Sequence, residues 1–378
     1  MKYLKQYLMA LLALTFSVCS FAGASSGVLS LEIMSYNLEN LFDTVHDSGK
    51  NDWGYLPKGA AGKHSACTKN NPKRYQKSCL ESDWSAEKLK MKLSQIKSVI
   101  LKERKTLPDV LGVSEIENEN VLAMLAAELG YKDYAITTSP DKRGIDVAVL
   151  YNEKEGLKFI KMTEHVMEGP TFGVKPTRNI LEAHFDLGKG RTLGVFVNHW
   201  PSQAAPGKVR HGVALQVKEE VERFLKSDKN FAIILGDFNT VPEDRPHPFW
   251  DGLVTKANGL TDIHSYFMYS EFISRDMKKA LPPGSYFYPP GMTWSLLDRF
   301  FVSPNLVNGK GVDIILSSYE IYTPAFITKT FKYDRPKDYL FGSEVVGAPN
   351  RYDHRATVSA KAGFSDHFPI VIKMVVPR

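Results

Sequence analysis

Short apolar runs recur along the chain, and most of them end at polar residues. Runs of this length, rich in β-branched and aromatic residues, are typical of buried strands. The runs that predict strands are 31–36, 109–114, 145–151, 193–197, 231–235, 296–302 and 370–376. We therefore expect a core built largely from β-sheet.

Apolar residues recur at helical spacing in 89–100, 118–129 and 209–225. The second of these segments begins at Asn118, a residue type that caps helices, and ends before Gly130. Helices alternate with strands in the first two thirds of the chain, and strands dominate afterwards. This order predicts a layered α/β domain with a mixed sheet.

The N-terminus follows another pattern. Lys2 and Lys5 precede the uncharged run 8–22, and small residues follow it. This is the pattern of an export signal, so we predict that residues 1–24 are a cleaved signal peptide and that the protein is secreted or periplasmic. The apolar run is short for a transmembrane anchor.

A lipoprotein signal cleaved at Cys19 is a further alternative. The residues before it, Phe16 to Val18, are a poor match for the small residues that such a site prefers. Export would leave two cysteines, Cys67 and Cys79. We expect them to form a disulfide, because an oxidising compartment favours pairing. A zinc site is the alternative, but no second cysteine pair or close histidine pair accompanies them.

The composition is that of a folded, soluble protein. The chain has 378 residues, of which 43% are hydrophobic and 24% charged. Its formal net charge is +6, and Lys2 and Lys5 contribute two of these charges. The basic balance agrees with a polyanionic partner, although a solvated surface explains it equally well. No internal repeat is present, which excludes a solenoid.

Carboxylate, amide or imidazole groups stand at several strand ends. The residues in these places are Asn37, Glu115, Asp146, Asn198, His199, Asp237 and Asn239. Loops beyond strand ends gather side chains from distant parts of the sequence, so a ligand site is expected there. Asp237 and Asn239 alone would also fit an ordinary turn.

Asp298 lies within an apolar run, and burying a carboxylate without a partner is costly. His367, just before the last predicted strand, is a natural partner, because the carboxylate would fix its tautomer and stabilise its charged form. Arg299 is the alternative partner. By the same reasoning, Asp146 is a candidate partner for His199.

These groups together predict a metal-dependent phosphodiester site. Phosphoryl transfer needs charge neutralisation, an aligned nucleophile and a proton for the leaving oxygen. Hard oxygen ligands such as those of Asn37 and Glu115 favour Mg²⁺, with Ca²⁺ or Mn²⁺ as alternatives, over zinc.

The same segments resemble the endonuclease/exonuclease/phosphatase superfamily, which includes deoxyribonuclease I and the exonuclease III-type AP endonucleases. The matching segments, in the family's order, are Tyr36-Asn37, Glu115, Arg143 to Asp146, Asn198-His199, Gly236 to Asn239, Leu297-Asp298 and Ser365 to His367. Segments 34–43 and 198–202 look most like bacterial extracellular nucleases. The resemblance implies a four-layer α/β sandwich, two packed mixed β-sheets flanked by helices, in one catalytic domain over 25–378.

The resemblance also implies a role for each matching position. The metal ligands would be Asn37, Glu115 and Asp366. The catalytic groups would be His199, Asp237, Asn239 and His367, with Asp146 orienting His199 and Asp298 orienting His367. The substrate contacts would be Arg143, Arg178 and Asn198. The chain departs from the family's pattern in an insertion at about 44–84, whose role the resemblance does not assign.

The expected activity is hydrolysis of DNA or RNA by a monomer without stable membrane association. A sphingomyelinase-like phospholipid phosphodiesterase, or a phosphatase of the same superfamily, is the alternative. A membrane-active enzyme should expose a hydrophobic hairpin, for which 266–269 is a modest candidate. A non-enzymatic effector is disfavoured, because each matched catalytic position holds the expected residue type.

Overall fold

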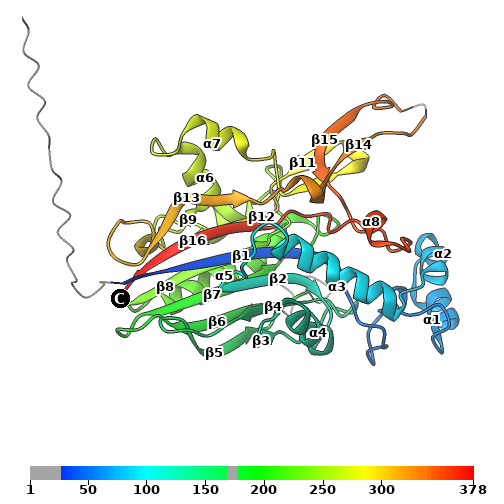
Figure 1. The fold of residues 1–378 in the computed structure, drawn as a ribbon, viewed down its shortest axis with the longest axis horizontal. Coiled ribbons are helices and arrows are strands. Elements are labelled where there is room, and N and C mark those ends of the chain that lie inside the picture. The colour runs from blue at the N-terminus through cyan, green and yellow to red at the C-terminus, as the bar shows by residue number, and fades with distance from the viewer. Residues whose placement is uncertain (1–26, 168–176, 337) are drawn as a thin grey trace, which may run out of the picture.

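Two six-stranded sheets pack face to face in the computed structural model, which describes residues 27–167, 177–336 and 338–378. Figure 1 shows the two sheets as the centre of the molecule. The predicted signal peptide, residues 1–24, lies outside the described residues. None of the described helices is both long enough and apolar enough to cross a membrane.

The first sheet has the strand order β13-β16-β1-β2-β4-β3. Its strands are β1 (Val28–Leu41), β2 (Val110–Ile116), β3 (Asp133–Ile136), β4 (Asp146–Tyr151), β13 (Asp313–Ile321) and β16 (Ile370–Pro377). Strand β1 is parallel to β2 and antiparallel to β16, so the sheet is mixed.

The second sheet has the order β5-β6-β7-β8-β12-β9. Its strands are β5 (Lys158–His165), β6 (Ile180–Asp186), β7 (Thr192–His199), β8 (Asn230–Asp237), β9 (Thr261–Asp262) and β12 (Asp298–Val302). Strand β7 is parallel to β8, and the other neighbours are antiparallel.

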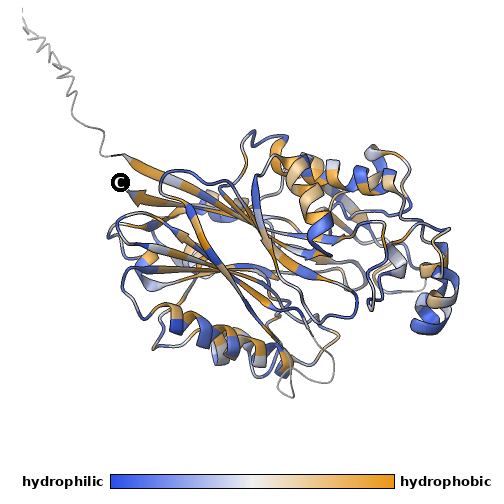
Figure 2. Ribbon diagram, turned by 90° about the horizontal axis from the view of Figure 1, so that it is seen from below, coloured by the Kyte–Doolittle hydropathy of each residue, from blue (hydrophilic) through white to orange (hydrophobic). Residues whose placement is uncertain are grey.

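Helices form the outer layers. Helix α5 (Gly207–Phe224) packs on the second sheet, and α3 (Ala86–Leu101) and α4 (Glu119–Leu129) pack beside the first. Figure 2 shows the apolar strands between helices on two sides. Strand β8 alternates accordingly: Ile233 and Leu235 join the core between the sheets, whereas Ile234 packs with α5. The predicted four-layer sandwich is confirmed.

The sheets approach each other closely where β2 crosses β8. A Cβ atom at Gly112 would lie 2.4 Å from Cδ1 of Leu235, so only glycine permits this spacing. Gly112 precedes Glu115 on β2, and Leu235 precedes Asp237 on β8. The close approach therefore brings the ends of strands from the two sheets together.

Short elements occupy the connections. They are η1 (Trp53–Tyr55), α1 (Lys63–Asn70), α2 (Lys73–Glu81), η3 (Pro248–Leu253), α6 (Ile263–Tyr269), α7 (Arg275–Ala280), η4 (Pro289–Gly291), η5 (Pro304–Leu306), η6 (Ala325–Ile327) and α8 (Ser359–Ala362). Two hairpins, β10 (Tyr286–Tyr288) with β11 (Thr293–Ser295) and β14 (Thr328–Lys332) with β15 (Glu344–Pro349), stand apart from the main sheets.

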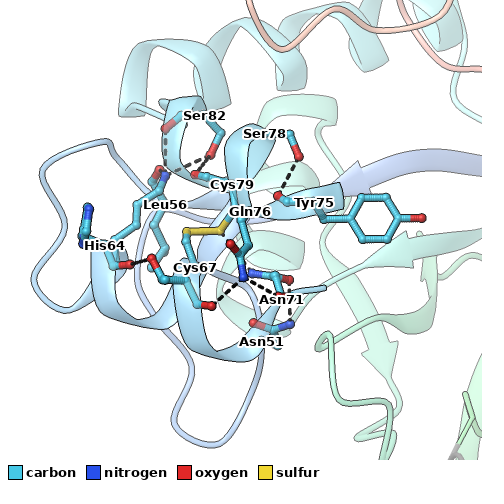
Figure 3. The surroundings of a disulfide bond; sticks show 12 residues. Asn51, Leu56, His64, Cys67, Asn71, Tyr75, Gln76, Ser78, Cys79 and Ser82 are labelled. Atoms are coloured by element: carbon cyan, nitrogen blue, oxygen red, sulfur yellow. Dashed lines mark hydrogen bonds between the residues drawn. A yellow bond between two sulfur atoms is a disulfide. The ribbon is translucent and has the colours of Figure 1, made fainter. Parts of the chain in front are cut away.

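The segment 44–84 carries the predicted disulfide between Cys67 and Cys79, whose Cα atoms are 5.6 Å apart. Figure 3 shows it joining α1 to α2. The Nζ of Lys63 donates to the backbone oxygens of Leu56 at 2.6 Å and Ser82 at 2.8 Å, which ties both ends of the segment to α1. Figure 1 places α1 and α2 at the end of the sandwich toward which β1 runs.

Candidate active site

Three neighbouring strands place chemically active side chains at one level. His199 at the end of β7 pairs in register with Asp237 at the end of β8, and Asp237 pairs with Asp298 at the start of β12. Gly236 permits this alignment: its φ is +131°, and a Cβ atom there would lie 2.0 Å from the backbone oxygen of Asn198. Strand register alone thus gathers an imidazole and two carboxylates.

The carboxylate of Asp237 is the centre of the site. Its Oδ2 accepts hydrogen bonds from the side-chain amides of Asn37 and Asn239, both at 3.0 Å. The Nε2 atoms of His199 and His367 lie 3.7 and 3.8 Å from the same oxygen. Burial raises the pKa of Asp237 to about 7, although the charge of His367 opposes this shift.

His367 is held as a charged imidazole. Its Nδ1 lies 2.7 Å from Oδ2 of Asp298, the partner expected from the sequence. Burial alone would lower the pKa of His367, but the carboxylates of Asp298 and then Asp237 raise it well above its usual value. Its Nε2 is therefore a proton-bearing donor at neutral pH.

His199 has the opposite character. Burial, and then the charge of Arg178, lowers its pKa well below the usual value, so the ring is neutral. Its Nδ1 has no hydrogen-bond partner within the described part of the chain. The expected Asp146–His199 pair does not form, because Asp146 Oδ1 instead accepts from Thr137 Oγ1 at 2.6 Å and from the backbone of Ser139 at 2.7 Å.

Glu115, His199 and Asp237 form a group that could hold a metal ion, with ligand atoms that all lie within 4.8 Å of one another. Glu115 reaches it from the first sheet, where the register of β2 shifts between Ser114 and Ile116 and the φ of Glu115 is 62°. Two carboxylates and a neutral imidazole are a donor set that suits a divalent cation. We call Glu115, His199, Asp237, Asp298 and His367 the strand-end site.

The comparison with protein families decides the assignment of this arrangement. The profile of the Endonuclease/Exonuclease/phosphatase family matches residues 32–376. The chain belongs to this family. The family's name joins nucleases and phosphatases, both of which hydrolyse phosphoester bonds. No curated protein matches the chain.

Solved structures of the family share the fold. An endonuclease/exonuclease/phosphatase family protein from Bacteroides thetaiotaomicron is 19% identical and has a TM-score of 0.51, covering 93% of this chain and 99% of its own. The human Nocturnin catalytic domain is 13% identical with a TM-score of 0.52, covering 92% and 96%. A humanized TDP2 from D. rerio is 14% identical with a TM-score of 0.53, covering 93% and 99%.

The metal ligands expected from the family's pattern are only partly brought together. Glu115 belongs to the metal-capable group, and Asn37 borders it through Asp237. The Oδ1 of Asn37 already accepts from the backbone of Glu39 at 2.9 Å. Asp366 lies outside the group and is 3.7 Å from Arg351.

Two of the expected substrate contacts hold the strand ends instead. The buried guanidinium of Arg178 donates to the backbone oxygens of His199, at 3.1 Å, and of Trp200. The buried amide of Asn198 donates to Phe196 and accepts from the Trp200 indole. Their hydrogen-bonding capacity is directed inward, so they support the position of His199.

The third expected substrate contact, Arg143, is accessible. Its side chain is 54% exposed and pairs with Asp141 at 3.0 Å. Of the three predicted substrate contacts, Arg143 is therefore the one whose side chain is placed to meet a phosphate.

Sequence reasoning missed a second charged cluster next to the site. Glu39 is buried, pairs with Arg351, and accepts from the backbone of Tyr352 at 3.0 Å. Burial, and then the charge of Asp366, raises the pKa of Glu39 to about 7. Burial lowers the pKa of Lys92 to about 8. The sequence signal that could have pointed to this cluster was the position of Glu39, two residues beyond Asn37 in the 34–43 segment.

Proposed function

We propose that this protein is an exported, divalent-metal-dependent phosphodiesterase that cleaves nucleic acid, DNA or RNA. The observation that carries the proposal is the convergence of His199 and His367 on Asp237. One histidine is neutral and the other is charged. A site that holds one proton acceptor and one proton donor around a carboxylate is suited to general acid–base hydrolysis.

The residues divide the work of hydrolysis among them. Glu115 and Asp237, with His199 beside them, would hold a divalent cation, which would neutralise charge on the phosphate oxygens. Mg²⁺ is the expected ion, with Mn²⁺ or Ca²⁺ as alternatives. Asp237 would orient the attacking water, and the neutral ring of His199 would accept its proton. His367, kept charged by Asp298, would donate its proton to the leaving oxygen as the P–O bond breaks, and Asn239 would keep Asp237 oriented.

Charge around the site supports a polyanionic substrate. The formal net charge of the chain is +6. Arg143 and Arg351 flank the site with side chains that are 54% and 56% exposed. Accessible arginines at the rim of a phosphodiester site suit a substrate that carries further phosphates beside the scissile one.

A specific observation favours one other candidate, a phospholipid phosphodiesterase. The connection between β14 and β15 exposes Tyr339, 93% accessible, and Phe341, 60% accessible, and β15 adds Val346 at 80%. In the 266–269 segment, Tyr269 is 87% exposed, and Phe272 just beyond it is 96% exposed. Exposed apolar side chains of this kind suit contact with a lipid surface.

An activity panel distinguishes these candidates. Purified protein is incubated with plasmid DNA, single-stranded DNA, RNA, sphingomyelin vesicles and a phosphomonoester in Mg²⁺, Mn²⁺ or Ca²⁺. We expect nucleic acid cleavage, and a loss of about 10²–10⁴-fold in His199→Ala. The matched control is His64→Ala, which removes an exposed histidine of α1.

The panel also defines failure. Sphingomyelin hydrolysis without nucleic acid cleavage would transfer the assignment to the lipid enzyme. Activity on the phosphomonoester alone would assign the protein as a phosphatase. Export is tested separately, by N-terminal sequencing of protein recovered outside the cytoplasm, where a mature chain that begins at about residue 25 is expected.

A further inference from the structure

A cavity of about 960 Å³ lies beside the strand-end site. One wall is the 44–84 segment, which contributes Tyr55 and Tyr75; a second is the loop 351–355; and a third includes Lys329 of β14. Volumes of this size accommodate ligands of several hundred daltons. The sequence assigned no role to the 44–84 segment, but this segment contributes more residues to the cavity lining than any other part of the chain.

The cavity adjoins the active site at Arg351. Arg143 and Arg351 line it, and Arg351 is also paired with Glu39 and lies 3.7 Å from Asp366. A nucleic acid whose scissile phosphate lies at Asp237 and Glu115 would therefore place an adjoining nucleotide in this cavity.

Aromatic side chains give the cavity flat surfaces. Tyr55 stacks on Phe42, with ring centroids 4.1 Å apart, and meets His354 edge-on at 5.9 Å. Tyr75, on α2, lines the opening and is 50% exposed. Rings held at the mouth and side of a pocket provide stacking platforms that accept any base.

The polar lining includes a group that lacks a partner. Asn51 donates to Asn71 at 3.2 Å, but its own Oδ1 is buried and has no hydrogen-bond partner within the described part of the chain. Both asparagines line the cavity. Protein atoms cover this oxygen, so it is not offered to the cavity, and the Asn51–Asn71 hydrogen bond fixes the polar part of the wall.

The charged lining favours an anion. The cations that line the cavity are Lys88, Arg143, Lys329, Arg351 and Arg355, against the acids Glu81, Asp83 and Asp353. The balance is positive, and Lys329 and Arg355 lie exposed at the rim. Arg355 pairs with Asp353 at 3.1 Å, so Lys329 is the side chain placed to meet a phosphate beyond the first one.

We propose that this cavity binds the nucleotide that adjoins the scissile phosphodiester of a single-stranded nucleic acid. Tyr75 stacks on the base, and Lys329 contacts the following phosphate. Walls on three sides suit an unpaired nucleotide, whose base is free to stack. This inference rests on the proposed nuclease function and assigns a substrate class to it.

The test compares Tyr75→Ala and Lys329→Ala with wild type on two substrates. One substrate is a single-stranded oligonucleotide, and the other is bis(p-nitrophenyl) phosphate, which needs the strand-end site but carries neither a nucleobase nor a further phosphate. We expect the KM for the oligonucleotide to rise about 5- to 20-fold in each variant, with kcat within about 2-fold. The rate on the small phosphodiester should not change. Lys226→Ala, an exposed lysine after α5, is the matched charge control.

Binding gives a second measurement. Anisotropy of a fluorescein-labelled oligonucleotide is measured in EDTA with each variant in the His199→Ala background, and the dissociation constant should rise by the same factor. An unchanged KM and unchanged binding in both cavity variants would overturn the cavity assignment while the nuclease stands. Equal losses on both substrates would also overturn it, because they indicate damage to the strand-end site. Wild type that hydrolyses the small phosphodiester but no oligonucleotide would remove the nuclease function and this assignment together.

Discussion

Two regions meet at the active site, the strand-end site and the 44–84 segment, and they are stabilised in different ways. His199 and Asp237 stand at the ends of adjacent parallel strands, and their positions are fixed by the backbone ladder of a buried sheet. The 44–84 segment contains only short helices, of which α1 buries little more than Lys63 and Cys67. The disulfide and the hydrogen bonds of Lys63 hold these helices, and Leu56 and Trp84 are the buried side chains that attach the segment to the core.

This contrast has a functional consequence. Side chains fixed by a sheet can be positioned accurately enough for chemistry, whereas a tethered surface segment tolerates change. We therefore expect changes in the strand-end site to act mainly on kcat and changes in the 44–84 segment to act mainly on KM. The predictions below test this division, in order of decreasing effect.

Removal of divalent metal should have the largest effect. Chelation with EDTA is expected to lower the hydrolysis of both polymer and small phosphodiester by at least about 10³-fold, because the phosphate charge is no longer neutralised. Binding of an oligonucleotide to the 44–84 side should persist in EDTA. Restoration of activity by added Mg²⁺ or Mn²⁺ is the control, and undiminished hydrolysis in EDTA would contradict the metal assignment.

The two carboxylates expected to orient histidines should differ sharply when changed. Asp298→Asn is expected to lower kcat by about 10²-fold or more, because the charged form of His367 loses its partner. Asp146→Asn should leave kcat within about 3-fold, because its contacts are to Thr137 and Ser139. Steady-state kinetics on bis(p-nitrophenyl) phosphate measure both. Equal losses would show that Asp146 does act on His199 during catalysis.

The same carboxylates show how much of the site was predictable from the sequence. Burial predicted that Asp298 needs a partner and made His367 a candidate, but it left Arg299 as an alternative, which the structure decides in favour of His367. The convergence at Asp237 followed from polar residues at the ends of apolar runs. Period and run length predicted a layered α/β domain with a mixed sheet, whereas the four-layer sandwich was predicted from the family resemblance.

The rest depended on information that is not local. Asp146 accepts hydrogen bonds from Thr137 and Ser139 instead of pairing with His199, and the spacing of residues in the sequence does not reveal this arrangement. Helices α1 and α2 lack a wide apolar stripe that periodicity could detect. The cavity joins the 44–84 segment to residues 351–355, which are far apart in the chain, so its existence could not be inferred before the fold was known.

Removing the disulfide should produce an intermediate effect. Replacing Cys67 and Cys79 together with serine removes a loop closure worth about 3 kcal/mol in the chain-entropy model, which loosens the 44–84 segment. We expect the KM for a single-stranded oligonucleotide to rise about 3- to 10-fold, with hydrolysis of the small phosphodiester within about 2-fold. Limited trypsin digestion should cleave the variant faster between 63 and 81. An equal loss on both substrates would contradict the division between the two regions.

The smallest effect should appear in the pH dependence of stability. Burial, and then the charges of Lys92 and Arg351, lowers the pKa of His354 from 6.5 to about 4. The unfolded chain therefore binds more protons than the folded one between these values, and the contribution of His354 to stability is present above pH 6.5 and lost as the pH falls toward 4. His367 does not add to this acid loss, because its raised pKa keeps it protonated in the folded state over the same range.

Wild type should lose stability between pH 7.5 and 4.5. We expect this loss to be smaller by about 1–2 kcal/mol in His354→Phe, which preserves the ring contacts with Tyr55 and Trp84. Urea unfolding at several pH values measures this difference, and His64→Phe on exposed α1 should leave the pH profile of wild type unchanged. If His354→Phe and wild type lose stability in parallel, His354 is not buried as a neutral ring. If the pH profiles of the two proteins diverge as expected and kcat is the same in both, the titration of His354 affects stability without affecting catalysis at the strand-end site.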